Sequence, residues 1–254
     1  KQVVIMIHCG SRGLGHQVCD DFERRLVPML QDFDFNLPDR QLACAPIDSN
    51  IGRQYIGAMA AAANFAWANR QIIMHWVRGV FEKVFGESAQ KLGMKLIYDV
   101  AHNIAKFEEH DVKGIRKRLL VHRKGATRAF PAGREELSQP FRQTGQPVII
   151  PGDMGRTSFI LVGTERAMDE TFGSTCHGAG RNMSRRAAIK KTKGRKIHQE
   201  LSEKGIYVRW AGRNTLNEEV SEAYKDVSDV VAAVEGAGIS RKVARMRPIG
   251  VVKG

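Results

Sequence analysis

Residues 147–162 read PVIIPGDMGRTSFILV, and this stretch decides the expected fold class. Pro147–Ile150 and residues 158–162 are apolar and β-branched, which favours strands. They flank a glycine turn at 151–155, and no helical segment separates them. Along the rest of the chain, helices and strands alternate without a regular β–α–β rhythm. We therefore expect an α+β protein with mixed sheets and flanking helices.

Further elements are expected on both sides of this stretch. After a glycine turn at 10–15, apolar residues recur at helical spacing, which predicts a helix through Leu30. The alanine-rich stretch 51–85 predicts two helices that close at Gly86. Strands are expected at 2–7, 95–100, 119–122 and 246–252, and a helix at 227–234. The strand at 2–7 is apolar throughout, so we expect it to be fully buried.

Length and composition suit one soluble domain. The 254 residues are 43% apolar, enough for a substantial core. No run approaches the roughly 18 consecutive apolar residues of a membrane span. Four cysteines without a CxxC pair argue against a disulfide framework or a zinc knuckle and indicate the reducing cytoplasm. We expect a single catalytic domain over residues 1–254 and, because a buried strand begins at once, the carboxy-terminal part of a longer protein.

The charge balance indicates a polyanionic partner. Forty Lys and Arg against 27 Asp and Glu give a net charge of +13, which favours nucleic acid slightly over a merely basic protein. Eight basic residues and no acidic one lie between 181 and 196: Arg181, Arg185, Arg186, Lys190, Lys191, Lys193, Arg195 and Lys196. Most such runs are solvated helix faces, but nothing within this one could pair with it, so we favour nucleic-acid contact. A smaller basic loop is expected at 123–128.

Three histidines and three glycine turns could carry chemistry. His8, His102 and His177 each lie where an apolar strand gives way to a polar turn, and imidazole can bind a metal, accept a proton or attack phosphorus. Glycine turns at 10–15, 151–155 and 178–180 could present backbone N–H groups to phosphate, although neither GxGxxG nor a P-loop occurs. Two of these turns directly follow one of the histidines. A histidine beside a phosphate-binding turn is the arrangement that nucleotidyl transfer needs.

Seven strings together resemble the RtcB-type RNA ligases, also called tRNA-splicing ligases. In chain order they are HCGSRGLGHQV (8–18), DRQLACAPI (39–47), MAAAANFAWANR (59–70), YDVAHNIAK (98–106), LVHRKGATRAFP (120–131), ETFGSTCHGAGR (170–181) and RPIGVVKG (247–254). The match runs through the whole chain, and CHGAGR and the terminal VKG are its most specific parts.

The resemblance implies an activity and its reactants. Members join an RNA end that carries a 3′-phosphate or 2′,3′-cyclic phosphate to a 5′-hydroxyl end, using GTP and Mn²⁺. The histidine of CHGAGR, here His177, would attack the α-phosphate of GTP and carry GMP as a phosphoramidate. The partners implied are RNA and an archease activator, with no membrane.

Site residues follow from the same resemblance. His8 and His102 correspond to metal ligands, and Arg12, Arg181 and Arg185 to contacts for RNA phosphates. Positions around the guanylate correspond to His102, Asn103, Pro151, Gly152, Asp153, Met154, Ser158, His177, Gly178, Ala179, Gly180, Tyr224 and Lys253. The family's further metal ligands, an Asp and a bridging Cys, lie together with an Asn-His motif in an amino-terminal half that this sequence does not contain. Two other interpretations stay open: an RNA-binding module without catalysis, and a metal-dependent phosphoesterase.

Overall fold

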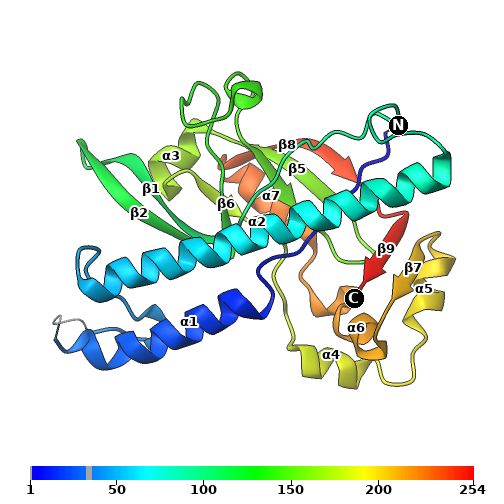
Figure 1. Ribbon diagram of the computed structural model, residues 1–254, viewed down its shortest axis with the longest axis horizontal. Coiled ribbons are helices and arrows are strands. Elements are labelled where there is room, and N and C mark those ends of the chain that lie inside the picture. Colours follow the sequence, from blue (N-terminus) through cyan, green and yellow to red (C-terminus); the bar gives the residue numbers. More distant parts are fainter. Residues whose placement is uncertain (1, 33–35) are drawn as a thin grey trace. The chain divides into compact units, whose positions relative to one another are not determined.

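Both helices and strands form in residues 2–32 and 36–254, the part of the chain described by the computed structural model (Figure 1). The helices are α1 (Gly13–Leu26), α2 (Asn50–Phe85), α3 (Glu165–Thr171), α4 (Arg185–Lys191), α5 (Ile197–Glu203), α6 (Arg213–Glu218) and α7 (Val227–Gly236), with short 3₁₀ turns at Val27–Leu30, Arg40–Leu42, Gln139–Phe141 and Ser221–Ala223. The strands are β1 (Asn103–Val112), β2 (Ile115–Lys124), β3 (Ala126–Arg128), β4 (Pro147–Ile150), β5 (Ser158–Gly163), β6 (Ser174–Cys176), β7 (Tyr207–Trp210), β8 (Ser240–Met246) and β9 (Gly250–Lys253). The expected α+β class is confirmed.

The chain divides into two units, Lys1–Ala101 and His102–Gly254, and each is described by itself. The expectation of a single catalytic domain stays a prediction. None of the helices formed by the described residues combines the length and apolar character that a membrane crossing requires.

The first unit is built on α1 and α2, which lie side by side (Figure 1). Phe22 and Leu26 of α1 pack on Ile51 of α2, as the helical spacing of apolar residues predicts. The alanine-rich stretch forms one 36-residue helix, so the prediction of two helices was wrong: no proline interrupts it. Ser49 caps its start by accepting a hydrogen bond from the Gly52 N–H at 3.1 Å, and Gly86 ends it with φ of +69°.

Two expected strands of this unit are absent. Residues 2–7 and 95–100 have no strand structure, and the first of these segments is not buried, since Val3 is 70% exposed and Ile5 45%. A β-strand needs a hydrogen-bonding neighbour, whereas an apolar β-branched sequence expresses only a preference. Within the described residues neither segment pairs with a strand.

The second unit begins with a hairpin that the sequence did not reveal. β1 and β2 pair antiparallel over ten residues each, and Lys113 and Gly114 form the turn with φ of +55° and +79°. Most residues of β1 are polar, so no apolar run in the sequence indicates this strand. The expected strand at 119–122 is confirmed as part of β2. The expected basic loop was wrong, because Arg123 and Lys124 belong to β2.

A three-stranded antiparallel sheet, β4–β5–β8, carries one core of this unit. Val148 and Ile150 of β4 and Leu161 of β5 are fully buried, and Val227 and Val231 of α7 pack on them. The strands expected at 147–150 and 158–162 and the helix at 227–234 are confirmed. The short pair β3–β6 leads from this core into the segment after Cys176.

β7 and β9 form a parallel pair that closes a second core with α4, α5 and α6. Met154, from the turn between β4 and β5, lies in this second core. The final strand expected at 246–252 is divided: β8 ends at Met246, and β9 begins at Gly250 after Pro248, which cannot donate a strand hydrogen bond. Parallel and antiparallel pairs both occur in the described residues, in separate small sheets within the expected α+β class.

Candidate functional site

His177 lies in the segment that follows β6, and its surroundings set it apart. Its ring centroid is 4.8 Å from that of His102, with the two rings tilted by 45°. Its Nδ1 atom is buried and has no hydrogen-bond partner among the described residues. This edge of the ring faces Gly125: a Cβ added there would lie 3.6 Å from Cε1. The predicted site residues His102 and His177 therefore come together, with Asn103 next to His102 in the chain. A buried ring nitrogen without a partner needs an explanation beyond packing.

The glycine turn at 151–155 adjoins the His177 segment. A Cβ added to Gly178 would lie 3.7 Å from the Pro151 carbonyl oxygen, so the two turns touch through glycine. At Gly152 an added Cβ would lie 2.0 Å from the Thr157 carbonyl oxygen, so only glycine fits there. Cys176 and Ala179 pack on the core of the β4–β5–β8 sheet. This core therefore supports both turns.

Side chains in and around the glycine turn at 151–155 hold the backbone of that turn in place. Ser158 Oγ accepts a hydrogen bond from the Gly152 N–H at 2.9 Å. Asp153 Oδ1 accepts from the Gly155 N–H at 2.9 Å and from Ser221 Oγ at 2.5 Å, and this carboxylate is buried. Met154 lies in the second core. These predicted guanylate neighbours therefore fix the backbone of the turn.

A carboxylate that the sequence reasoning missed, Glu219, joins three predicted site residues. Its Oε2 accepts a hydrogen bond from the Tyr224 hydroxyl at 2.6 Å and lies 3.4 Å from Lys253 Nζ. Its Oε1 accepts from Arg181 at 3.3 Å. Burial and the hydrogen bond to Glu219 raise the pKa of Tyr224 to about 12. Glu219 stands in no motif, and only the fold brings it to Tyr224 and Lys253.

Arg181 is held inside the protein. Its guanidinium lies over the Tyr224 ring at 4.8 Å, and it donates to the Tyr224 hydroxyl at 2.8 Å and to the carbonyl oxygen of Glu218 at 2.6 Å. Its role as an RNA contact stays a prediction, and in this structure its donors already have protein acceptors.

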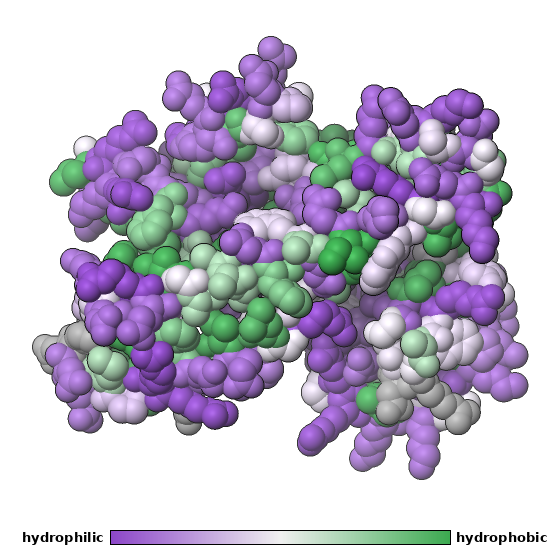
Figure 2. All heavy atoms as spheres, viewed as in Figure 1, coloured by the Kyte–Doolittle hydropathy of each residue, from purple (hydrophilic) through white to green (hydrophobic). Residues whose placement is uncertain are grey.

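The basic run is only partly neutralised. Arg195 pairs with Glu200 at 2.5 Å and with Glu222 at 3.0 Å, and Arg181 pairs with Glu219 at 3.3 Å, so two members of the run find partners outside it. No ion pair between described residues involves the other six. Arg185 and the lysines of α4 are exposed, and long hydrophilic side chains project near α4 in Figure 2. The second unit has 29 Lys and Arg against 17 Asp and Glu, and the first has 11 against 10, so nearly all of the positive charge belongs to the second.

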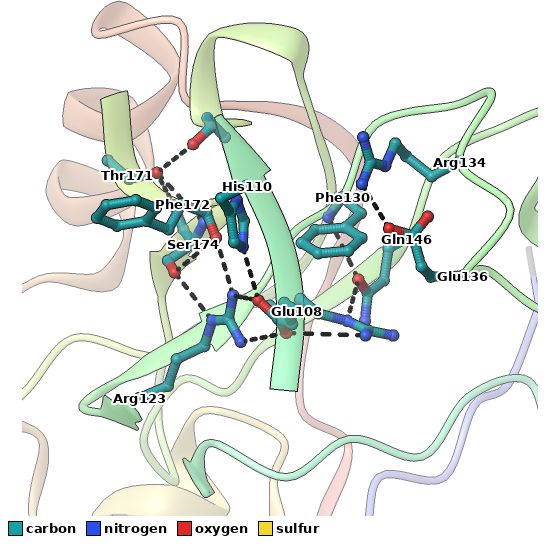
Figure 3. A network of polar contacts seen from close by, with 12 residues as sticks. Glu108, His110, Arg123, Phe130, Arg134, Glu136, Gln146, Thr171, Phe172 and Ser174 are labelled. Atoms are coloured by element: carbon teal, nitrogen blue, oxygen red, sulfur yellow. Dashed lines mark hydrogen bonds and ion pairs between the residues drawn. The ribbon is translucent and has the colours of Figure 1, made fainter. Parts of the chain in front are cut away.

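A buried ion-pair network anchors β6, three residues before His177 (Figure 3). Arg123 donates two hydrogen bonds of 2.8 Å to Glu108, and its Nε donates to Ser174 Oγ at 2.9 Å. It also donates to the Phe172 carbonyl oxygen at 2.9 Å, and His110 Nε2 lies 3.0 Å from Glu108. Burial by itself raises the pKa of Glu108, but the bonds from Arg123 outweigh burial and lower it. Arg123, expected in a basic loop, is therefore buried and paired.

His8 and Arg12 lie in the first unit, where their segment is tied to α2. Asn69 donates a hydrogen bond to the Gly10 carbonyl oxygen at 2.8 Å, and Arg70 pairs with Asp99 at 2.7 Å. Arg12 has φ of +56°, an unusual conformation for a residue with a side chain. No group of three His, Cys, Asp or Glu side chains among the described residues is placed to hold a metal ion. The metal role of His8 and His102 stays a prediction.

The cysteines behave as isolated thiols. All four are free, so the expectation that there is no disulfide framework is confirmed for Cys9, Cys19, Cys44 and Cys176. Burial raises the pKa of the Cys176 thiol, which keeps it neutral beside His177.

Comparison with known proteins agrees with these motifs. A family model described as tRNA-splicing ligase RtcB matches residues 1–254. The chain is 61% identical over 252 residues to the tRNA-splicing ligase RtcB of Archaeoglobus fulgidus, covering 99% of this chain and 52% of that protein. It is 56% identical to the Pyrococcus horikoshii protein of the same name, covering 100% and 29%, and 54% identical to that of Thermococcus kodakarensis, covering 100% and 52%. The chain thus spans about half of the length of two of these relatives and less of the third.

Proposed function

The chain belongs to the tRNA-splicing ligase RtcB family, and from this premise we propose that it supplies the nucleotide-transfer centre of an RNA ligase. The reaction joins an RNA 3′-phosphate or 2′,3′-cyclic phosphate end to a 5′-hydroxyl end with GTP as co-substrate. The observation that carries this proposal is His177: a half-buried imidazole beside His102, flanked by two glycine turns that touch.

The first step is the transfer of GMP to His177. Because Nδ1 is buried against Gly125, Nε2 is the nitrogen that attacks. An N–P bond forms at the α-phosphate of GTP while the bond to pyrophosphate breaks. The nitrogen that attacks must carry a free lone pair. The glycine turns at 151–155 and 178–180 would offer backbone N–H groups to the phosphate oxygens.

The later steps release His177. The RNA 3′-phosphate attacks the phosphoramidate and takes the GMP, and the 5′-hydroxyl then displaces GMP to form the phosphodiester. Arg185 of the second unit and Arg12 of the first would each bind RNA phosphates. Tyr224 and Lys253, which Glu219 holds together, would contact the guanosine.

Metal binding is proposed through imidazole. Nitrogen ligands such as His8 and His102 suit Mn²⁺, which would supply positive charge against phosphate repulsion. The pairing of His102 with His177 fits this arrangement, since a ligand next to the nucleophile brings that charge to the reacting phosphate.

The test is labelling with GTP that carries ³²P at the α-position. The chain is incubated with Mn²⁺, alone and with the segment of the Archaeoglobus fulgidus relative that it does not match. We expect an acid-labile protein label that His177→Ala abolishes and that His75→Ala, an exposed histidine of α2, leaves intact. RNA binding without any label would support the non-catalytic module, and RNA cleavage without a label the phosphoesterase. Either result would overturn the proposal.

A further inference from the structure

A basic groove lies beside the candidate site on the other side of the turn between β4 and β5. It encloses about 410 Å³ and is bounded by Gly155–Thr157, the connection from α5 to β7 at 204–206, the start of α7, and residues 245–249. All of these belong to the second unit. Pro151 lies next to Gly178 of the His177 segment, while residues 155–157 of the same connection line the groove.

The groove is lined by an excess of positive charge. Four cations lie along it, Arg156, Lys204, Arg245 and Arg247, against one carboxylate, Asp226. That carboxylate accepts the Ser228 N–H at 2.8 Å and lies 3.8 Å from Arg156 Nε. No ion pair between described residues involves the other three cations, and all three are exposed. Like charges held together without partners favour an anion.

The lining indicates which anion. Arginine forks match phosphate oxygens, and no aromatic side chain lines this groove to stack on a base. A neighbouring hollow of about 510 Å³ shares Ser228 and Arg245 and extends the surface along the edge strand β8 past Lys242. Phe159, Val231 and Val243 also line this hollow, but Phe159 is only 5% exposed, so the accessible cations suit the phosphates of an extended strand better than its bases.

We propose that this groove binds backbone phosphates of single-stranded RNA, at a subsite separate from the guanylate site. The proposal rests on the proposed function in that the bound strand is the ligase substrate. Arg245 and Arg247 are the principal contacts, and the strand continues along the shared turn toward His177.

The test compares charge-matched variants. Arg245→Ala/Arg247→Ala removes the groove cations, and Arg116→Ala/Lys117→Ala removes two exposed cations from β2. Binding of a fluorescent 20-nucleotide uridine RNA is measured by anisotropy from low to moderate salt. Each lost contact lowers the slope of log K against log salt by about 0.7, so the groove variant should lose about 1.4 and the β2 variant much less. Arg245→Lys/Arg247→Lys should keep most of the slope.

Other outcomes are equally decisive. An equal loss in both alanine variants would mean general surface charge and would overturn the groove. If the groove variant keeps RNA binding but loses inorganic phosphate binding, detected by NMR shifts, the groove would be assigned to free phosphate. This result would also overturn the proposal of an RNA-binding groove. Labelling of His177 by GTP is measured in the same variants and should stay intact. If wild type is never labelled but the groove variant still loses RNA binding, the ligase proposal fails and the groove stands.

Discussion

The buried pair Glu108–Arg123 gives the sharpest test of how β6 is held. Glu108→Ala removes a carboxylate whose side chain is 3% exposed and leaves Arg123, 2% exposed, as an unpaired buried charge. Such a loss costs about 3–5 kcal/mol. The neighbouring Glu109 provides the control, since it lies 3.8 Å from Arg116 at the surface, where a pair contributes at most about 1 kcal/mol. The losses in the free energy of unfolding caused by the two substitutions are therefore expected to differ several-fold.

The assay is urea denaturation followed by circular dichroism. Glu108→Ala should lower the free energy of unfolding by about 3–5 kcal/mol and Glu109→Ala by less than about 1 kcal/mol. Glu108→Leu/Arg123→Met replaces the pair by apolar side chains and should recover most of the loss. Equal effects of the two alanine substitutions would refute a stabilising role for the network.

Acid provides an independent check of the same pair. The folded pKa of Glu108 lies below its ordinary value of 4.5. Its contribution is therefore complete above that value and is lost as the pH falls through the depressed folded pKa. Glu108→Ala should flatten the decline in stability at acid pH. An unchanged acid profile would contradict the shift.

Two further outcomes test the candidate site. Glu219→Gln should bring the pKa of Tyr224 down from about 12, because it removes the negative charge next to the hydroxyl; the pKa is measured by absorbance titration of tyrosinate. Glu218→Gln is the control, since the backbone carbonyl of residue 218 still bonds to Arg181, and it should leave the pKa of Tyr224 unchanged. Equal pKa shifts in the two variants would refute the role of Glu219. Gly152→Ala should destabilise the second unit by about 1–3 kcal/mol and abolish GTP labelling, because the added Cβ would meet the Thr157 carbonyl oxygen. Gly194→Ser is the control: its φ of +85° strains the backbone, but its side chain would enter open space, so the label should remain.

Local elements were predictable where the sequence pattern and the final environment agree. β4 and β5 consist of buried and half-buried residues and read as apolar runs, and α7 carries its apolar residues at helical spacing. The end of α2 at Gly86 was also predictable, since only a residue without a side chain freely adopts the left-handed conformation found there. Polar β1 was not, because its stability comes from cross-strand pairing and from the ion pair within it.

The candidate site divides in the same way. Amino-acid type and spacing alone indicated that His177 directly precedes a glycine turn and that His102 follows an apolar stretch, because nucleophiles and phosphate-binding turns are properties of short segments. Only the tertiary structure decided that these two rings meet, that Arg123 is buried instead of exposed, and that Glu219 serves Tyr224 and Lys253. Except for Glu219 and Tyr224, which are five residues apart, these contacts join residues distant along the chain. The partner of a charged group depends on which strands pair and which elements pack together, and its neighbours in sequence do not determine it.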